Sequence, residues 1–317
     1  MKDHTETENP PIRRFVERGV ETFEATIEGE IIRWDRGLTY SSHLQTAQLL
    51  SSQTPVSDKP DEMLFIIMHQ TMELWIKLML HEVREAMDAL RADRLDQAGR
   101  TLDRTATIMQ HMIHSWEVLA TLSPPEFLSF RGFLSKASGF QSQQYRELEF
   151  LLGLKRADLI LVHAGDDAAT ASLTKVLNTP SLYDEVLKVL ARHGAAIPAH
   201  KLERDWAQPY TQSEEVEHAW RDIYANPEAH WPLYALGEKV TALEYYFQEW
   251  RFKHMKTVAR VIGYKHGTGG SSGVAYLVRA LDLQFFPELW SMRTRMKVKD
   301  DSGAHAQGSG SQAEPEA

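Results

Sequence analysis

The run between Pro232 and Gly263 constrains the fold more than any other part of the sequence. It has no internal proline after Pro232, and its apolar or ring-bearing residues recur at alternating spacings of four and three. This spacing predicts one long helix with a stripe that faces other helices. The stripe consists of Leu236, Val240, Leu243, Phe247, Trp250, His254, Thr257 and Val261. The ionisable ring of His254 is therefore expected to point into the protein.

Several other runs also predict helices. A long and strongly apolar run, MLFIIMHQTMELWIKLMLHEVREAMDAL, follows a helix start within residues 58–62. Shorter ones are LDRTATIMQHMIHSWEVLATL, FQSQQYRELEFLLGL and TPSLYDEVLKVLARHG, the last with Thr179 as its expected cap. No internal repeat and no clear linker interrupt them. The predicted class is all-α, with a single large helical domain over residues 13–300.

The two ends of the chain differ from this domain in composition. Residues 1–12 and 301–317 are polar, small and turn-rich, so they bury too little apolar surface to offset the entropy of ordering. We expect a flexible N-terminus and a disordered tail.

Charge and composition restrict the partners and the location. A formal net charge of −9 disfavours binding to nucleic acid or to an anionic membrane unless a basic patch overcomes it, and no such patch is evident. The chain has no cysteine, no apolar stretch near the ~20 residues of a membrane span, and no apolar secretion signal at its N-terminus. We expect neither a nucleic-acid nor a membrane partner, and a cytoplasmic location.

His254 is joined by a second histidine on an apolar helix face. His69 shares its face of the long apolar run with Phe65, Met72 and Ile76, at i−4, i+3 and i+7. A lone histidine on such a face is more often a satisfied core residue than a ligand. Both interpretations stay open for this pair: two core histidines, or two imidazoles beside a ligand.

The other histidines do not complete a metal cage made of protein ligands. His111 and His114 lie three residues apart, and Glu215 with His218 forms one Glu-x-x-His pair, whereas a di-iron carboxylate bundle needs two. Zinc motifs with cysteine or His-Glu-x-x-His are lacking. A neutral imidazole that projects into an apolar, aromatic-rich cavity suits haem iron better, and without cysteine any haem is held non-covalently.

A glycine-rich loop, GTGGSSG, spans Gly267 to Gly273 and precedes a further expected helix. It lacks the lysine and the preceding strand of a phosphate-binding loop. It is either an ordinary flexible connection or a mobile lid over a small ligand, with Thr268 offering a hydroxyl. Arg131, in PEFLSFRGFL, either pairs with a carboxylate ligand or forms a surface salt bridge.

Four segments together resemble the tryptophan 2,3-dioxygenase family. They are LTYSSHLQTAQLL, DEMLFIIMHQTMELWIKLMLHE, FLSFRGFLSKASGFQSQQYRELEFLLG and RFKHMKTVARVIGYKHGTGGSSGVAYL, in the order of the family. The resemblance implies a cytosolic oxidoreductase with one non-covalent haem b per subunit, held between long helices. Such an enzyme inserts both atoms of O2 across the indole C2–C3 bond of L-tryptophan. Formation of the product, N-formyl-L-kynurenine, is the first step of tryptophan catabolism through the kynurenine pathway.

The resemblance also implies roles for individual residues. His254 corresponds to the axial ligand of the haem iron, and His69 to the distal histidine that hydrogen-bonds the indole N–H. Arg131 corresponds to the partner of the substrate carboxylate, and Thr268 to the lid residue near the ammonium and carboxylate of the substrate. The remaining matches are the pocket wall, with Phe65, Ile66, Ile67 and Met68, the aromatic Phe127, and Trp116 against the haem.

A further segment carries an implication about assembly. Tyr40, His43 and Leu44 match the part that reaches, in the family, into the active site of a neighbouring subunit. The resemblance thus implies a homotetramer, built as a dimer of intertwined dimers. His43 stands where bacterial members carry tyrosine, and Phe127 where some members carry tyrosine and others phenylalanine. The first departure leaves the range of indole substrates open, but not the iron ligation or the carboxylate pairing.

Two other functions stay open at this point. One is a relative that keeps the fold but oxidises a modified tryptophan or another indole. The other is a non-enzymatic helical scaffold with two ordinary buried histidines.

Overall fold

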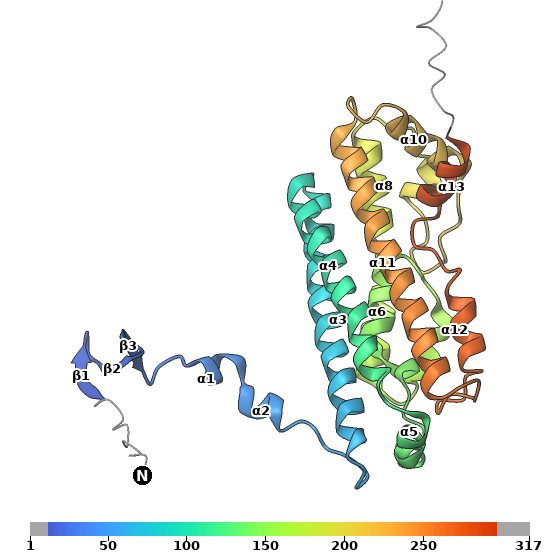
Figure 1. Ribbon diagram of the computed structural model, residues 1–317. Coiled ribbons are helices and arrows are strands. Elements are labelled where there is room, and N and C mark those ends of the chain that lie inside the picture. Colours follow the sequence, from blue (N-terminus) through green and yellow to red (C-terminus); the bar gives the residue numbers. More distant parts are fainter. Residues whose placement is uncertain (1–11, 297–317) are drawn as a thin grey trace, which may run out of the picture. The chain divides into compact units, whose positions relative to one another are not determined.

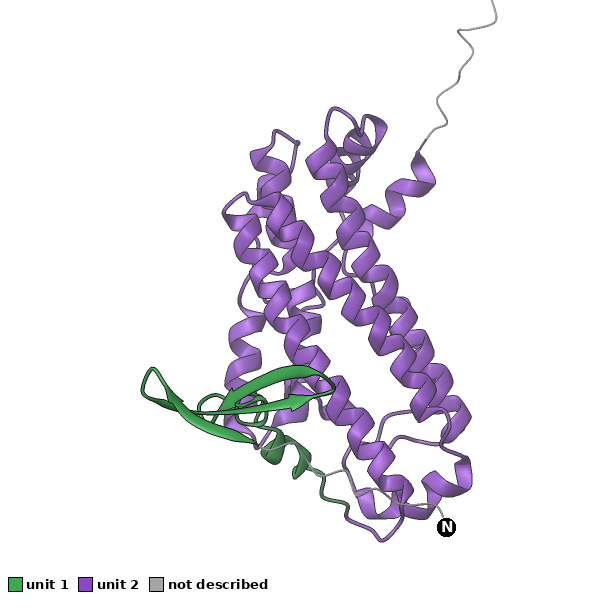
Figure 2. Cartoon of the chain, turned by 60° about the vertical axis from the view of Figure 1, so that its left-hand side comes forward, with its two compact units in different colours: residues 1–55 green, residues 56–317 purple. Residues whose placement is uncertain are grey.

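The computed structural model describes residues 12–296 (Figure 1). The chain divides into two compact units, residues 1–55 and residues 56–317 (Figure 2). Helices dominate the described part, which confirms the predicted mainly helical class. The predicted flexible N-terminus, apart from its last residue, and the predicted disordered tail lie outside the described residues.

The first unit contains a small antiparallel sheet that the all-helical expectation did not include. Its strands, in the order β1-β2-β3, are β1 (Arg13–Glu17), β2 (Val20–Ile27) and β3 (Glu30–Asp35). Arg18-Gly19 and Glu28-Gly29 make the two-residue connections, and all four residues have positive φ, which suits the twist of a tight hairpin. The alternating polar and apolar residues and these two glycine turns are the signals that predict such a sheet.

Two short helices follow the sheet, α1 (Tyr40–Leu44) and α2 (Thr46–Leu50). Thr39 caps α1, because its hydroxyl accepts from the Ser42 backbone N–H while the Ser42 hydroxyl accepts from the Thr39 N–H. Large apolar side chains of this segment are exposed: Leu38, Tyr40, Leu44, Leu49 and Leu50. Residues of the first unit therefore present apolar surface that this unit does not cover.

Three long helices form the frame of the second unit. They are α3 (Asp61–Arg91), α4 (Leu95–Leu119) and α11 (Trp231–Val261). α4 packs against both α3 and α11, and the three run side by side in Figure 1. α11 confirms the long helix predicted from the proline-free run, and most of its predicted stripe is buried, from Leu236 to Val261.

Shorter helices surround this frame. α5 (Pro124–Arg131) contacts both α3 and α11, and α6 (Gln143–Leu152) and α8 (Leu182–Arg192) pack against α3. The other α-helices are α7 (Asp167–Leu177), α9 (Ala199–Leu202), α10 (Glu214–Ala225), α12 (Val274–Ala280) and α13 (Pro287–Arg295). Three 3-10 helices are η1 (Gly132–Leu134), η2 (Gly139–Gln141) and η3 (Ala157–His163).

The start of α8 differs from the predicted one. Ser181 caps the helix, so the expected cap Thr179 was wrong. The Ser181 hydroxyl accepts from the Asp184 N–H, and the Asp184 carboxylate accepts from the Ser181 N–H. The Thr179 hydroxyl instead donates to the carbonyl of Val176, at the end of α7.

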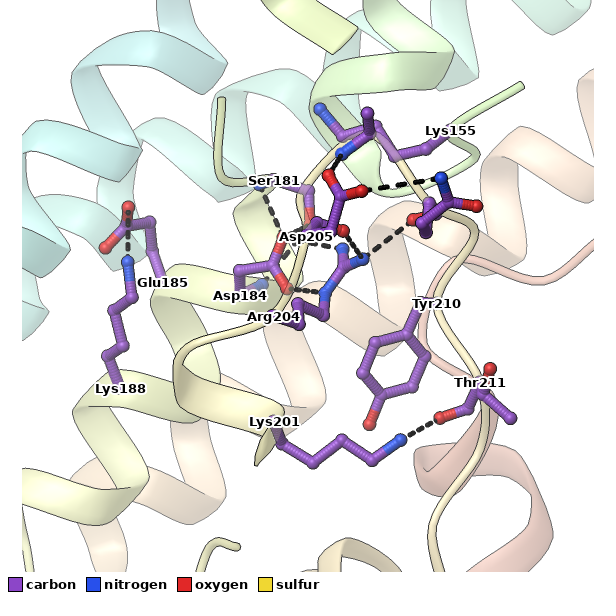
Figure 3. A network of polar contacts seen from close by, with 12 residues as sticks. Lys155, Ser181, Asp184, Glu185, Lys188, Lys201, Arg204, Asp205, Tyr210 and Thr211 are labelled. Atoms are coloured by element: carbon purple, nitrogen blue, oxygen red, sulfur yellow. Dashed lines mark hydrogen bonds and ion pairs between the residues drawn. The ribbon is translucent and has the colours of Figure 1, made fainter. Parts of the chain in front are cut away.

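A polar network ties the segment before α10 to the start of α8 (Figure 3). Arg204 donates to both carboxylate oxygens of Asp184, at 2.8 and 3.0 Å. The fully buried Lys155 donates to the carbonyls of Val176 and Thr179, at 2.7 and 2.8 Å. Burial lowers the pKa of Lys155 to about 7, against the opposing effect of Asp184. The charges of this network are satisfied within the fold.

By length and composition alone, α3 could cross a membrane, and it is the one helix in the described residues of which this is true. The expectation that the chain has no such apolar stretch was therefore wrong for this helix. In the folded chain α3 packs against α4, α6 and α8. A core helix of a helical bundle has the same composition, because its apolar stripe is covered by neighbouring helices.

A buried carboxylate fastens the C-terminal segment to α11. Glu244 is fully buried and accepts three hydrogen bonds: from the backbone N–H of Phe285 at 2.6 Å, from that of Phe286 at 3.1 Å, and from Trp290 Nε1 at 2.8 Å. No other acceptor is recorded for these three donors among the described residues. Glu244 therefore fixes where the chain returns to the bundle.

We predict that Glu244→Ala lowers the free energy of unfolding by about 3 kcal/mol, because several buried donors lose their acceptor. Urea denaturation followed by circular dichroism measures this change. The matched control is Glu117→Ala, which removes an exposed carboxylate paired with Lys253 and should cost less than about 1 kcal/mol. Equal losses in the two variants would contradict the anchoring role of Glu244.

Candidate active site

The structure brings together the two histidines that the sequence singles out. His69 lies on α3 and His254 on α11, and each is half-buried. They are close enough for a charge on His69 to lower the pKa of His254. Both helices pack against α4, and α5 contacts both of them, so the pair lies where α3 begins and α11 ends.

His254 is neutral at physiological pH. Desolvation is the main cause that lowers its pKa to about 4, and the nearby His69 lowers it further. The imidazole stacks on the indole of Trp116, with ring centroids 4.5 Å apart and planes 12° apart. Trp250, one turn earlier on α11, lies 5.6 Å from the imidazole. A neutral imidazole in aromatic surroundings keeps a nitrogen lone pair available for a metal.

His69 is held in one tautomer. Its Nδ1 lies 2.7 Å from the carbonyl oxygen of Phe65, and a carbonyl can only accept, so Nδ1 carries the hydrogen. Nε2 of the neutral ring is then an acceptor. Desolvation lowers the pKa of His69, although the Phe65 carbonyl and the charge of Glu73 oppose this effect. His69 can therefore accept a hydrogen bond from an N–H group of a ligand.

An aromatic wall borders His69. Phe65 lies 4.1 Å from the imidazole, 5.9 Å from Phe127 and 5.7 Å from Phe130, measured between ring centroids. Phe127 and Phe130 are buried and meet edge to face at 5.3 Å. The sequence predicts Phe65 and Phe127 for this site, and the structure adds Phe130, which lies three residues from Phe127 on the same helix.

The other residues predicted for this wall lie at different places around α3. Met68 is buried in the core, Ile66 is half-buried, and Ile67 is 47% exposed. Two residues along a helix turn the side chain by about 200°, so Ile67 points away from the face of Phe65. Within one chain, Ile67 does not share the pocket wall with Phe65 and His69.

Arg131 and the glycine-rich loop meet in the structure. Arg131 Nη2 donates to the carbonyl of His266 at 2.6 Å, and the Thr268 hydroxyl donates to the carbonyl of Ala137 at 2.6 Å. A Cβ on Gly269 would lie 2.9 Å from the Ser138 Cβ, so glycine permits this close approach. The loop is thus docked on the segment that follows α5.

Tyr40, His43 and Leu44 lie in α1 of the first unit, and their side chains are exposed there. Their role in the pocket of a neighbouring subunit stays a prediction.

The chemistry of the site fits haem better than a metal held by protein ligands alone. Within residues 12–296, no three side chains of His, Cys, Asp or Glu gather as a metal site. A metal beside His254 would thus have fewer than three such protein ligands, and a macrocycle would supply the remaining donors. The two indoles beside His254 also have buried N–H groups without an acceptor, Trp116 Nε1 and Trp250 Nε1. A bound group with acceptor atoms would suit them.

Comparison with known proteins decides the family. The family model described as tryptophan 2,3-dioxygenase matches residues 27–296, which is most of the chain. The chain belongs to the tryptophan 2,3-dioxygenase family.

Curated members of the family are similar over most of their length. The tryptophan 2,3-dioxygenase of Polaromonas sp. (strain JS666) is 50% identical over 261 residues, which are 82% of this chain and 89% of that protein. That of Bordetella parapertussis is 47% identical over 273 residues, or 86% and 96% of the two chains. That of Bacillus thuringiensis subsp. konkukian is 48% identical over 259 residues, or 82% and 93%.

The matched range contains every candidate residue of the site, from Tyr40 to Thr268. Trp250 is an addition from the structure, since its indole lies 5.3 Å from Trp116 and 5.6 Å from His254. Its position one turn before His254 in the predicted stripe was the signal in the sequence that could have identified it as a site residue. Sequence alone did not reveal the stacking partner from α4.

We predict that the buried neutral His254 makes the haem-free protein less stable in mild acid. The pKa of His254 is about 4 in the folded chain against 6.5 as the ordinary value, so the unfolded chain binds more protons below pH 6.5. The stability contributed by the neutral ring is present above pH 6.5 and is lost as the pH falls towards 4.

Comparison with His254→Leu isolates this effect. From pH 7 to pH 5, the haem-free wild type should lose about 2 kcal/mol more free energy of unfolding than the variant does. Urea titrations at the two pH values measure it. A pH-independent difference between the two proteins would contradict the depressed pKa.

Proposed function

We propose that this chain is a haem-dependent dioxygenase that converts L-tryptophan and O2 to N-formyl-L-kynurenine. Membership of the family supports the reaction. The observation that supports the site is the pair of neutral imidazoles, His69 and His254, beside one aromatic pocket. The proposed reaction is the first step of tryptophan degradation through kynurenine.

His254 would hold the iron of a non-covalent haem b, one per chain, and Trp116 would lie against this group. When bound, haem supplies the redox-active iron at which O2 is activated for addition to the indole C2–C3 bond. Desolvation keeps the His254 imidazole unprotonated, so protons do not compete for its ligating nitrogen near neutral pH. The aromatic rings around both histidines exclude water from the reacting atoms.

Arg131 and Thr268 would bind the amino-acid end of the substrate. Arg131 Nη2 already contacts the loop, but Arg131 Nε is buried without an acceptor, and a carboxylate would supply one. The docked loop places Thr268 beside the segment that carries Arg131. Substrate binding and loop docking would therefore use the same guanidinium group.

His69 would orient the indole ring. Its Nε2 is an acceptor because Nδ1 donates to Phe65, and the indole N–H is a donor. Phe65 and Phe127 would pack against the ring and fix its plane. Anchors at both ends of the substrate would bring the indole C2–C3 bond to one position in the pocket. Positioning explains the place of His69 without an obligatory role as a base.

We further propose a cytoplasmic homotetramer, a dimer of dimers in which the segment from Tyr40 to Leu44 enters the pocket of a neighbouring subunit. Exposed apolar side chains in the first unit support this assembly, because Leu38 and Tyr40 are each 78% exposed. The histidine at position 43, where bacterial members carry tyrosine, would affect which indole substrates the enzyme accepts.

We predict that haemin-loaded wild-type protein binds one haem per chain and forms N-formylkynurenine from L-tryptophan in air, as chromatography of the product would show. His254→Ala should change the absorption spectrum of the iron and lower the activity by more than about 100-fold, which exceeds the usual loss from an outer partner of a metal ligand. His114→Ala, at an exposed site on α4, is the matched control. A His254→Ala spectrum identical to that of the wild type would refute the axial assignment, and a product formed only from another indole would refute the substrate.

We predict that Arg131→Ala lowers kcat/KM for L-tryptophan by about 100-fold, through KM, because a charge-assisted hydrogen bond is lost. Steady-state kinetics with an indole that lacks a carboxylate should show a much smaller effect. Gly269→Ala controls for the loop, since it disturbs docking on Ser138 but keeps the guanidinium, and should affect both substrates alike. Equal effects of Arg131→Ala on both substrates would remove its carboxylate role.

A further inference from the structure

No described side chain or backbone group of the protein supplies His254 with the hydrogen bond that usually orients a metal-binding histidine. Such a histidine normally donates its second ring N–H to a carboxylate, a carbonyl or water. Among the described residues, no hydrogen bond to either ring nitrogen of His254 is recorded, whereas Nδ1 of His69 is bonded to a carbonyl. The causes that shift the pKa of His254 are desolvation and the charge of His69, without a hydrogen-bond contribution.

A parallel aromatic contact takes the place of this hydrogen bond. The indole of Trp116 covers the imidazole, with centroids 4.5 Å apart and only 12° between the planes. Trp116 is 4% exposed, so its indole is enclosed by the fold and stays against the imidazole. A rotation of the imidazole out of this plane would drive its edge into the indole.

Trp116 is itself wedged in place. The indole of Trp250 lies 5.3 Å from that of Trp116, measured between ring centroids, with the planes 50° apart. The ring of Tyr145 on α6 stacks in turn on Trp250, at 5.4 Å. Arg251, next to Trp250, donates to Glu149 of α6 at 2.9 Å, and both side chains are buried. The rings thus form a series from α6 to His254, Tyr145–Trp250–Trp116–His254, that a buried ion pair holds together.

We propose that Trp116 is a positioning residue that sets the plane of the His254 imidazole, by stacking, in place of a hydrogen-bonded partner. The proposal rests on the haem-binding function proposed above. Stacking fixes the ring without placing negative charge on it, whereas a carboxylate partner would raise the basicity of the ligand. The chain therefore presents a neutral imidazole of fixed orientation to the iron.

Two substitutions separate stacking from the filling of space. Trp116→Phe keeps an aromatic face against the imidazole, and Trp116→Met fills similar space without one. Haemin-loaded protein would be studied by resonance Raman spectroscopy of the ferrous iron–histidine stretch and by electron paramagnetic resonance of the ferric form. Trp116→Met should shift or split the stretch, broaden the ferric signals and release haem about 10 to 100 times faster. Trp116→Phe should keep the wild-type spectra.

Trp75→Met is the matched control. Trp75 also has a buried indole N–H without an acceptor and meets a histidine, but edge to face and at His111 of α4. The Trp75→Met substitution should leave both spectra unchanged. Wild-type spectra in Trp116→Met would overturn the proposal, and so would equal shifts in Trp75→Met and Trp116→Met.

A second experiment does not depend on how well Trp116→Met retains haem. His254→Gly, supplied with free imidazole, should bind this ligand at the iron in an orientation that Trp116 sets. The ferric signals should then match those of the wild type when Trp116 is present or is replaced by phenylalanine, and broaden in the His254→Gly protein that also carries Trp116→Met. Identical signals in the His254→Gly proteins with Trp116 and with Trp116→Met would overturn the proposal.

These outcomes separate the positioning role from the proposed function. If the wild type binds no haem, or if His254→Ala leaves the iron spectrum unchanged, the haem assignment itself fails. If His254 ligates the iron and Trp116→Met keeps the wild-type spectra, only the positioning role fails.

Discussion

The packing of α4 against both α3 and α11 is the constraint on which the rest of the site depends. His69 and His254 are 185 positions apart in the chain numbering, yet their helices share this one neighbour. α4 also supplies Trp116, the ring that stacks on His254. A single set of helix contacts therefore places the candidate metal ligand His254, its stacking partner Trp116 and His69 at one end of the bundle.

Desolvation links this packing to the chemistry. Water around an imidazole favours its charged form, and the helices remove that water, so the pKa of both histidines lies below that of a free histidine. Burying these polar rings costs the folded chain free energy. The same burial leaves a nitrogen of His254 available to bind a metal, and Nε2 of His69 available to accept a hydrogen bond. The reaction proposed for this chain would use both at one pocket.

The substrate end of the pocket depends on backbone contacts as well as side chains. Arg131 reaches the carbonyl of His266, and Thr268 reaches the carbonyl of Ala137, so the loop is held at two points. Gly269 approaches Ser138 so closely that a Cβ would clash. The sequence showed that the loop is rich in glycine, but composition alone could not distinguish a lid from a connection, because the distinction lies in what the loop contacts.

Helical periodicity by itself determined the helical class, the length of α11 and the inward place of His254, since an apolar stripe at spacings of three and four must be covered. It did not determine the small sheet, because a helical period carries no information about strands, whose own signals are the alternation and the two glycine turns. Only the tertiary structure decided that Trp116 stacks on His254 and that Arg131 holds the glycine loop. Local periodicity reports which side of a helix is buried, whereas the partner on that side depends on contacts between residues far apart in the chain.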